Sequence, residues 1–385
     1  MDAGPLPPRS AAQARWRPAG CQSIVLVLQG GGALGAYQAG VYQALHEAGL
    51  EPDWLNGVSI GGINAALIAG NPPERRLERL REFWDMITDR PVWLVPPNGE
   101  EMHEAHNLWS AWLTLTLGQR GFFQPRMPPA WLRPRGATGA TSVYDSAPLR
   151  ETLLRLVDFD LINSRQTRIA VGAVNVGNGN STVFDNCEAE LLAEHVMASA
   201  ALPPALPMVE IGTDYYWDGG IVSNTPLQHV FDCAGTANLL VFQVDLFSSR
   251  GAVPRDLVGV MARQKDIQYA SRTRFVTDHF RALRKRDIAL RGVLAKLPED
   301  ELTPEERTLK ERLAHLPEIS IIHMIYQRAA YEGGDRDYEF SRLSMREHWE
   351  SGYRDTERTL RHKAWLEIPS EADGIVVHDV HRLED

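Results

Sequence analysis

The sequence predicts an α/β fold with a mainly parallel central sheet that helices cover on both faces. From residue 24 onward, a short apolar segment runs into a glycine-rich turn and then into a helix-like stretch, and the same order repeats at once. Several later segments are rich in Val and Ile, as is typical of strands that are buried on both faces. Because strands that alternate with helices usually pair in parallel, these observations together indicate a parallel sheet.

The first expected strand lies at residues 24–28 and leads through the turn "QGGGALG" into a helix at about residues 36–48. A second strand at residues 54–58 is followed by another turn and a helix at about residues 62–69. Four later apolar runs are expected to add strands at residues 167–176, 181–186, 238–247 and 318–327. Charged stretches with helical periodicity lie at residues 255–316 and 341–365.

Changes in composition suggest how the chain is divided. Residues 1–23 are rich in Pro, Ala and Arg and are expected to form a disordered leader, because they lack the continuous apolar run of a signal peptide. A core at residues 24–254 contains a Trp-rich insertion at residues 91–141. A helical C-terminal extension covers residues 255–385, and its strand at residues 318–327 is expected to join the core sheet.

The composition argues against several classes of protein. No run approaches the roughly 18 apolar residues of a membrane-spanning helix, so any membrane contact would be peripheral. The formal net charge of −10 argues against nucleic acid as a partner, since nucleic-acid binding needs clustered Lys and Arg. Cys21, Cys187 and Cys233 are widely spaced and suggest neither a disulfide framework nor a zinc site, which favours a cytoplasmic location.

The segment "NGVSIGG" at residues 56–62 carries the strongest chemical signal. Gly57-x-Ser59-x-Gly61 follows a strand and precedes an apolar helix, which is the context of a nucleophile elbow. There the glycines let the backbone turn sharply and expose the Ser59 hydroxyl, while the helix N-terminus stabilises developing negative charge. Taken alone, the motif fits equally well with Ser59 as the N-cap of the following helix.

The glycines of the first turn also allow two interpretations. They match the G-x-G-x-x-G fingerprint of dinucleotide binding, which needs an acidic residue at the end of the second strand. The acids with suitable spacing, Glu51 and Asp53, precede that strand instead. Ser59 occupies the position where an acidic residue would bind the ribose. We therefore expect the backbone N–H groups of Gly30, Gly31 and Gly32, with that of Ile60, to form an oxyanion hole.

A serine nucleophile needs a base, and the sequence offers two candidates. An α/β-hydrolase triad could be assembled from Ser59, Asp245 at a strand end and His323. It is disfavoured, because the elbow follows several strands in that fold, and His323 lies in an apolar strand where a core histidine is the ordinary interpretation. The other candidate is Asp218 in "YYWDGGIVSNTP", although an Asp-Gly pair alone also fits an ordinary turn.

Four motifs follow one another along the core: "QGGGALG", "GVSIGG", "ASAALPPALPMV" and "DGGIVSNTP". This ordered set closely resembles the patatin-like phospholipase family. The resemblance implies a three-layer α/β/α core, and a dyad of Ser59 as nucleophile and Asp218 as base. It also implies that the first glycine turn is the oxyanion loop and that Gly219 and Gly220 belong to the motif of the base.

The resemblance further implies a serine lipid acyl hydrolase that works on a lipid ester through an acyl-enzyme, with no metal and no organic cofactor. A dyad without histidine is chemically reasonable, because burial raises the pKa of a carboxylate and makes it a better base. Hydrolysis of another hydrophobic ester, such as a storage polyester, and acyl transfer on the same fold stay open as alternatives. Leu34 departs from the family pattern, which often has Arg or Lys there.

The weaker signals each keep two interpretations. His103 and His106 lie near several acids but form no HExxH pair, which favours a solvated polar turn over a metal site. The basic stretch at residues 272–291 is either a solvated helix face or a contact for anionic lipid. The Trp-rich insertion is either a small apolar core or a flap that also meets a membrane interface. The end of the chain resembles an uncharacterised extension of some bacterial patatin-like proteins.

Overall fold

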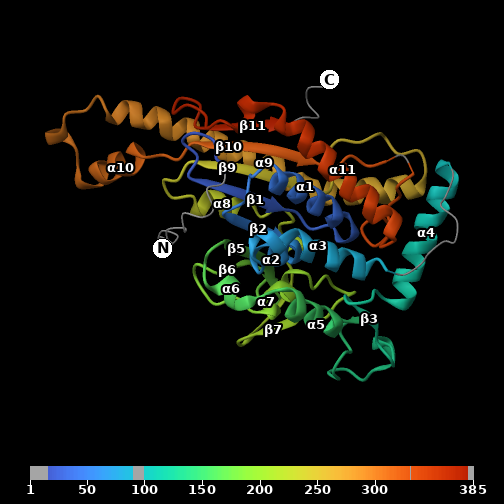
Figure 1. The fold of residues 1–385 in the computed structure, drawn as a ribbon. Coiled ribbons are helices and arrows are strands. Elements are labelled where there is room, and N and C mark those ends of the chain that lie inside the picture. The colour runs from blue at the N-terminus through green and yellow to red at the C-terminus, as the bar shows by residue number, and fades with distance from the viewer. Residues whose placement is uncertain (1–15, 90–98, 330, 380–385) are drawn as a thin grey trace.

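The computed structural model describes residues 16–89, 99–329 and 331–379, which form a large central sheet with helices around it (Figure 1). The strands of this sheet are β1 (Ser23–Leu28), β2 (Trp54–Val58), β5 (Arg168–Asn175), β6 (Ser181–Asp185), β7 (Val209–Ile211), β8 (Asp214–Asp218), β9 (Leu239–Asp245), β10 (Ile319–Ile325) and β11 (Ile375–Asp379). A separate small ladder pairs β3 (Gln124–Pro125) with β4 (Tyr144–Asp145). The α-helices are α1 (Gly35–Glu47), α2 (Ile60–Ala69), α3 (Pro73–Ile87), α4 (Glu100–Leu117), α5 (Ala147–Leu156), α6 (Phe159–Asn163), α7 (Ala193–Ser199), α8 (Leu227–Cys233), α9 (Leu257–Leu294), α10 (Pro304–Ala314) and α11 (Arg342–Leu360).

The order of the strands in the sheet is β11-β10-β9-β1-β2-β5-β8-β7, and β6 pairs with β5. The five strand pairs from β11 to β5 are parallel, whereas β6, β7 and β8 enter the sheet through antiparallel pairs. The predicted α/β fold with a mainly parallel sheet is therefore confirmed. The carboxyl ends of β1 and β2, which are neighbours, bring the two glycine turns to the same edge.

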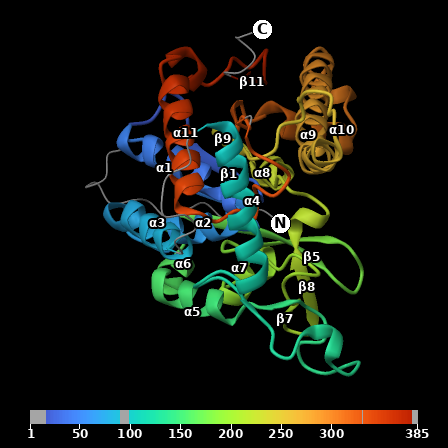
Figure 2. The same cartoon turned by 90° about the vertical axis from the view of Figure 1, so that its right-hand side faces the viewer.

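The alternation of side chains along the strands produces the three layers. In β1, Ile24, Leu26 and Leu28 belong to the core cluster that includes α1, α2 and α3, while Val25 and Val27 pack with residues of α8 and α9. Figure 2 shows α1, α3 and α11 on one side of the sheet and α8 and α9 on the other. Both faces are buried, which explains why the central strands read as continuous apolar runs.

The C-terminal part of the chain contributes to the sheet. The strand expected at residues 318–327 is β10, which pairs in parallel with β9, and β11 adds an edge strand that the sequence analysis did not anticipate. Residues 1–15 of the expected leader and residues 90–98, which include the start of the expected insertion, lie outside the described residues. No helix in the described part of the chain combines the length and apolarity needed to cross a membrane.

Helices α1 and α11 cross so closely that their backbones touch. A Cβ atom on Gly40 would overlap the carbonyl oxygen of Trp349, and one on Gly352 would overlap the carbonyl oxygen of Tyr37. The Tyr37 hydroxyl also donates a hydrogen bond to Asp355 Oδ2 at 2.9 Å. This crossing fixes α11, and with it the segment that precedes α11, over the first glycine turn.

We expect Gly352→Ala to destabilise the protein by about 1–3 kcal/mol or more, because the added methyl group must push two helix backbones apart. The free energy of unfolding from urea titration measures this effect. Gly292→Ala is the matched control, since no atom lies within 4 Å of a Cβ built at that position in α9. The control should stabilise the chain by roughly 0.5–1 kcal/mol through helix propensity. Equal effects at the two positions would contradict the close crossing.

Candidate active site

The turn between β2 and α2 holds Ser59 in a strained backbone conformation. Its φ of 57° and ψ of −126° lie in a region that residues with a Cβ atom rarely adopt. A Cβ atom on Gly57 would overlap the carbonyl oxygen of Gly61, and one on Gly61 would overlap that of Leu28. The two glycines are therefore required by close packing inside the turn. Ser59 occupies the N-cap position of α2, but its side chain makes no capping hydrogen bond, so the hydroxyl group does not serve as a cap.

Ser199, at the end of α7, fixes the backbone of this turn. The Ser59 N–H group donates to both the carbonyl oxygen and the Oγ of Ser199, each at 3.1 Å. The Ser199 Oγ in turn donates to the carbonyl oxygen of Gly172 in β5 at 2.6 Å. The sequence analysis did not single out Ser199, and its only signal was its place in the motif "ASAALPPALPMV".

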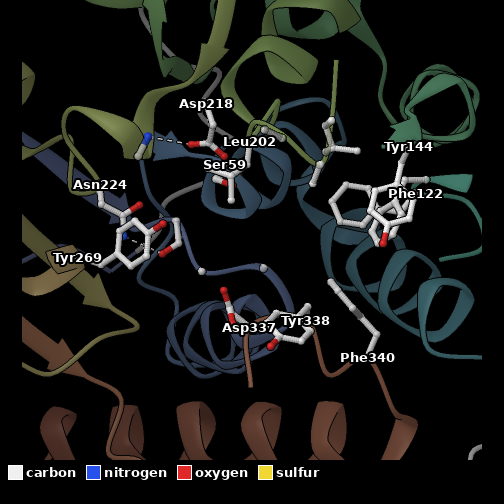
Figure 3. Close-up of a pocket in the computed structure, with 18 of the residues that line it drawn as sticks. Ser59, Phe122, Tyr144, Leu202, Asp218, Asn224, Tyr269, Asp337, Tyr338 and Phe340 are labelled. Carbon is white, nitrogen blue, oxygen red and sulfur yellow. Dashed lines mark hydrogen bonds between the residues drawn. The ribbon is translucent and has the colours of Figure 1, made fainter. Parts of the chain in front are cut away.

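Asp218 lies at the end of β8 and points toward Ser59 in the close-up of the site (Figure 3). The carboxyl group is buried, and this desolvation raises its pKa to about 7, against the opposing effects of a side-chain hydrogen bond with Ser59 and a backbone hydrogen bond. That backbone bond comes from the Gly220 N–H group, which donates to Asp218 Oδ1 at 2.8 Å. A carboxyl group with this pKa is half ionised near neutral pH, which suits a general base.

The first glycine turn is held in place by Asn224 of the motif "DGGIVSNTP". The Asn224 Nδ2 donates to the carbonyl oxygen of Gly30 at 3.0 Å, and the Gly30 N–H donates back to the Asn224 carbonyl at 3.3 Å. By contrast, the N–H groups of Gly31, Gly32 and Ile60 donate no hydrogen bond to any described residue. These are the backbone donors that remain available to an anion, whereas the Gly30 N–H is already engaged.

The same turn packs tightly against the segment before α11. Gly32 has a φ of 54°, and a Cβ atom there would overlap the carbonyl oxygen of Asp337. The Asp337 carbonyl also accepts a hydrogen bond from the Ala33 N–H at 2.7 Å. Glycine is needed at position 32 both for its backbone angles and for this approach. Leu34 is fully buried in the core, so the side chain at this position does not face the site.

Ser59, Asp218 and the glycine turn line one cavity of about 200 Å³ (Figure 3). Most of its other walls are apolar or aromatic: Leu115, Phe122, Phe123, Tyr144, Ala200, Leu202, Ala205, Leu206, Phe247, Tyr269, Tyr338 and Phe340. Figure 3 shows Phe122 and Tyr144 well apart from Asp218 and Asn224, with Ser59 between the two groups. The cavity therefore places a polar reacting centre beside a largely apolar space.

The C-terminal part of the chain supplies one wall of the cavity, which the sequence analysis missed. Tyr269 comes from α9, and Asp337, Tyr338 and Phe340 come from the segment before α11. No motif marked these residues, because their position depends on how α9 and α11 return to the core.

Asp245 and His323 of the alternative triad do not line this cavity. Asp245 is buried at the end of β9, where it accepts hydrogen bonds from Gln243 at 2.9 and 3.1 Å and from Thr225 at 3.4 Å. His323 lies within β10 and is paired in register with Gln243, so β9 and β1 separate its strand from β2. The structure thus brings Ser59 together with Asp218 and not with Asp245 or His323.

His103 and His106, the two histidines of the weak metal signal, both lie on α4 and contact different residues. His103 stacks on Tyr331 with ring centroids 4.7 Å apart, whereas His106 is buried and approaches Asn107 Oδ1 with its Nδ1 at 3.3 Å. Within the described ranges, no group of three or more His, Cys, Asp or Glu side chains could hold a metal ion.

The strain at Ser59 predicts an unusual order of stability. Ser59→Gly should be more stable than Ser59→Ala by about 1–2 kcal/mol, because both variants lack the hydroxyl group and only glycine relieves the backbone strain. Thermal and urea unfolding of the two variants measures the difference. In the middle of a regular helix or strand the order would be reversed, so greater stability of the alanine variant would contradict the strained turn.

Comparison with known proteins places the chain in a family. The chain is 54% identical over 48 residues to lysophospholipase nte1 of Aspergillus terreus, which covers 12% of this chain and 3% of that protein. It is 50% identical over 54 residues to neuropathy target esterase sws of Drosophila melanogaster, covering 14% of this chain and 4% of that protein. The chain thus spans only a small part of the length of these relatives.

Among solved structures, VipD from Legionella pneumophila aligns with 88% of this chain and 67% of its own, at 15% identity and a TM-score of 0.38, which is too low to carry an argument. A family model described as patatin-like phospholipase matches residues 26–231, more than half of the chain. A second model, described as patatin phospholipase, matches residues 267–372. The chain therefore belongs to the patatin-like phospholipase family.

Proposed function

We propose that the protein is a serine hydrolase of lipid esters that uses Ser59 as nucleophile and Asp218 as base. The observation that carries this proposal is the meeting of the strained Ser59 with a buried carboxyl group whose pKa is raised to about 7, in an apolar cavity. Family membership and the names of the relatives, a lysophospholipase and an esterase, support the same class of reaction.

The geometry supports a two-step mechanism. Asp218 accepts the proton of the Ser59 hydroxyl while Oγ attacks the ester carbonyl carbon. The oxyanion that forms faces the N–H groups of Gly31, Gly32 and Ile60, and Asp218 then gives its proton to the leaving alcohol. A water molecule, deprotonated by Asp218, attacks the acyl-enzyme, and the proton returns to Ser59 as the fatty acid leaves. In this mechanism Gly30 shapes the loop through Asn224 rather than donating to the oxyanion.

The cavity favours a substrate with a hydrophobic acyl group. Its aromatic and aliphatic walls offer few polar partners beyond the reacting centre, so an acyl chain can lie there without leaving buried polar groups unpaired. A storage polyester presents similar acyl groups, and an alcohol in place of water would turn hydrolysis into acyl transfer. Either hydrolysis is simpler than acyl transfer, because it requires no second organic substrate, and the names of the relatives favour a lipid ester.

The raised pKa of Asp218 gives the reaction a defined pH dependence. Because the base must be ionised, kcat/KM should rise with pH and level off above a midpoint of about 7, instead of the midpoint near 4 of an ordinary aspartate. Asp218→Asn should lower kcat/KM by at least about a hundredfold. The pH–rate profile of a chromogenic ester measures both effects.

Asp245→Asn is the matched control for the base, because burial also raises the pKa of Asp245 to about 7 while its side chain lies outside the cavity. This variant and His323→Ala should keep both the rate and the midpoint. A fluorophosphonate probe should label the wild-type chain and not Ser59→Ala. Loss of turnover in His323→Ala, with activity retained in Asp218→Asn, would overturn the dyad.

Helix α4, beside the cavity, supports peripheral contact with a lipid surface. It buries polar side chains against the protein: His106, Asn107, Ser110 and Thr114. It exposes apolar ones: Leu108, Trp109, Trp112, Leu115 and Leu117. Trp109 and Trp112 stack with ring centroids 4.8 Å apart and are 46% and 51% exposed. Leu115 belongs both to this face and to the cavity wall, so we propose that the apolar face of α4 lies on the membrane where substrate enters.

Replacing Trp109 and Trp112 together with Ala should weaken co-sedimentation with phosphatidylcholine vesicles by roughly tenfold, since Trp side chains contribute strongly at membrane interfaces. Phe275→Ala in α9 is the control, because Phe275 is 71% exposed on another element. Hydrolysis of a short soluble ester should be unchanged in both. Unchanged partitioning of the double variant would contradict the membrane contact, and loss of a dimer instead would assign the face to a second copy of the chain.

A further inference from the structure

A second cavity, of about 340 Å³, lies between the segment after β9, the start of α9 and the segment after β10. Five arginines and two aspartates are among its lining residues: Arg250, Arg255, Arg263, Arg328, Arg336, Asp256 and Asp266. In a chain whose formal net charge is −10, this is a local excess of positive charge. Neither the proposed reaction nor the motifs of the sequence account for it.

The aspartates are already engaged. Asp266 forms an ion pair with Arg336, whose side chain is only 4% exposed and whose Nε has no hydrogen-bond partner among the described residues. Asp256 caps α9 by accepting the Gly259 N–H at 2.7 Å. Arg263 donates to the carbonyl oxygen of Ser248 at 3.2 Å. The arginines of this cavity are therefore only partly neutralised within the chain.

Two of the arginines have no partner in the described structure. Arg255 and Arg328 are exposed, and no hydrogen bond or ion pair joins either of them to another described residue. Guanidinium groups present several donors in a planar fork that matches the oxygens of a phosphate group. A cavity with several such groups has the chemistry of a phosphate site.

Exposed apolar side chains near the cavity point to the source of the phosphate. Val253 lines the cavity and is 86% exposed, and Leu257 and Met261 of the first turns of α9 are 73% and 62% exposed. The start of α9 lies on the same side of the molecule as α4 (Figures 1 and 2). A free phosphate would gain nothing from these exposed apolar side chains, whereas a phospholipid would bring a headgroup to the cavity and acyl chains to them.

We propose that this arginine cavity binds the phosphate headgroup of an anionic membrane phospholipid, while Val253, Leu257 and Met261 enter the interface. The site is separate from the catalytic cavity and does not depend on the reaction there. Bound in this way, the chain would be attached at two places, by α4 through apolar contact and by the arginine cavity through charge.

The test uses the full chain with Ser59→Ala, so that no lipid is consumed, and vesicles of phosphatidylcholine with or without phosphatidic acid. Phosphatidic acid should raise co-sedimentation, and Arg255→Glu with Arg328→Glu should reduce that gain by roughly tenfold or more. The gain should also shrink as salt concentration rises. Replacing the same two residues with Lys should retain much of the binding, since the charge remains. In the otherwise wild-type chain, the charge reversal should leave hydrolysis of a short soluble ester unchanged.

Arg286→Glu is the control for charge alone, because Arg286 lies on α9, is 68% exposed, pairs with Asp287 and does not line the cavity. An equal loss of binding in this control would overturn the site in favour of general charge attraction. No response to phosphatidic acid would overturn it as well. If inorganic phosphate raises the Tm while vesicle binding ignores phosphatidic acid, the ligand is free phosphate and the lipid assignment fails. An unchanged Tm in the Arg255 and Arg328 variants confirms that they fold.

Discussion

The burial of the Asp218 carboxyl group is the constraint on which the rest of the site depends. Desolvation is the largest cause of the raised pKa of Asp218, and a carboxylate with a pKa of about 7 is a better base than an ordinary aspartate. Burial requires walls on every side. The β8 strand and the Ser59 turn provide some of them, and Asn224 with Tyr269 lines the same cavity. Asp218 is thus buried by its neighbours, whereas Ser59 beside it is only half-buried.

Part of that shell comes from the far end of the chain. The Asp337 carbonyl group meets Ala33 beside the glycine turn, and its position follows from α11, which is pressed against α1 at Gly40 and Gly352. The C-terminal segment therefore does more than extend the sheet through β10 and β11. It also contacts the first glycine turn, so the region matched by the second family model packs against the region matched by the first.

The sequence predicted those features that depend on local pattern. The parallel strands and the Ser59 turn are local, because a strand, a sharp turn and a helix each have a short signature, and the family resemblance added Asp218. The walls made by Tyr269, Tyr338 and Phe340 depend on how distant helices return to the core, and no local pattern encodes that. The engagement of the Gly30 N–H by Asn224 was equally hidden, since two backbones 194 residues apart must meet to form it. Local sequence thus indicated the chemistry, and tertiary packing determined which donors and walls serve it.

The same burial that raises the pKa of Asp218 opposes folding at neutral pH. Between about pH 4 and pH 7 the folded chain keeps a proton on Asp218 that the unfolded chain has released. This group therefore destabilises the folded state increasingly as pH rises through that range. Asp245 acts in the same direction, because its pKa is also raised by burial. Glu332, buried in an ion pair with His348, acts in the opposite direction. Its pKa is lowered in the folded chain, so the stability that it contributes is lost as pH falls. The strained Ser59 adds a further penalty that does not depend on pH. The close crossing of α1 and α11 lies outside the catalytic cavity, so its packing does not depend on the ionisation of Asp218 or on the strain at Ser59.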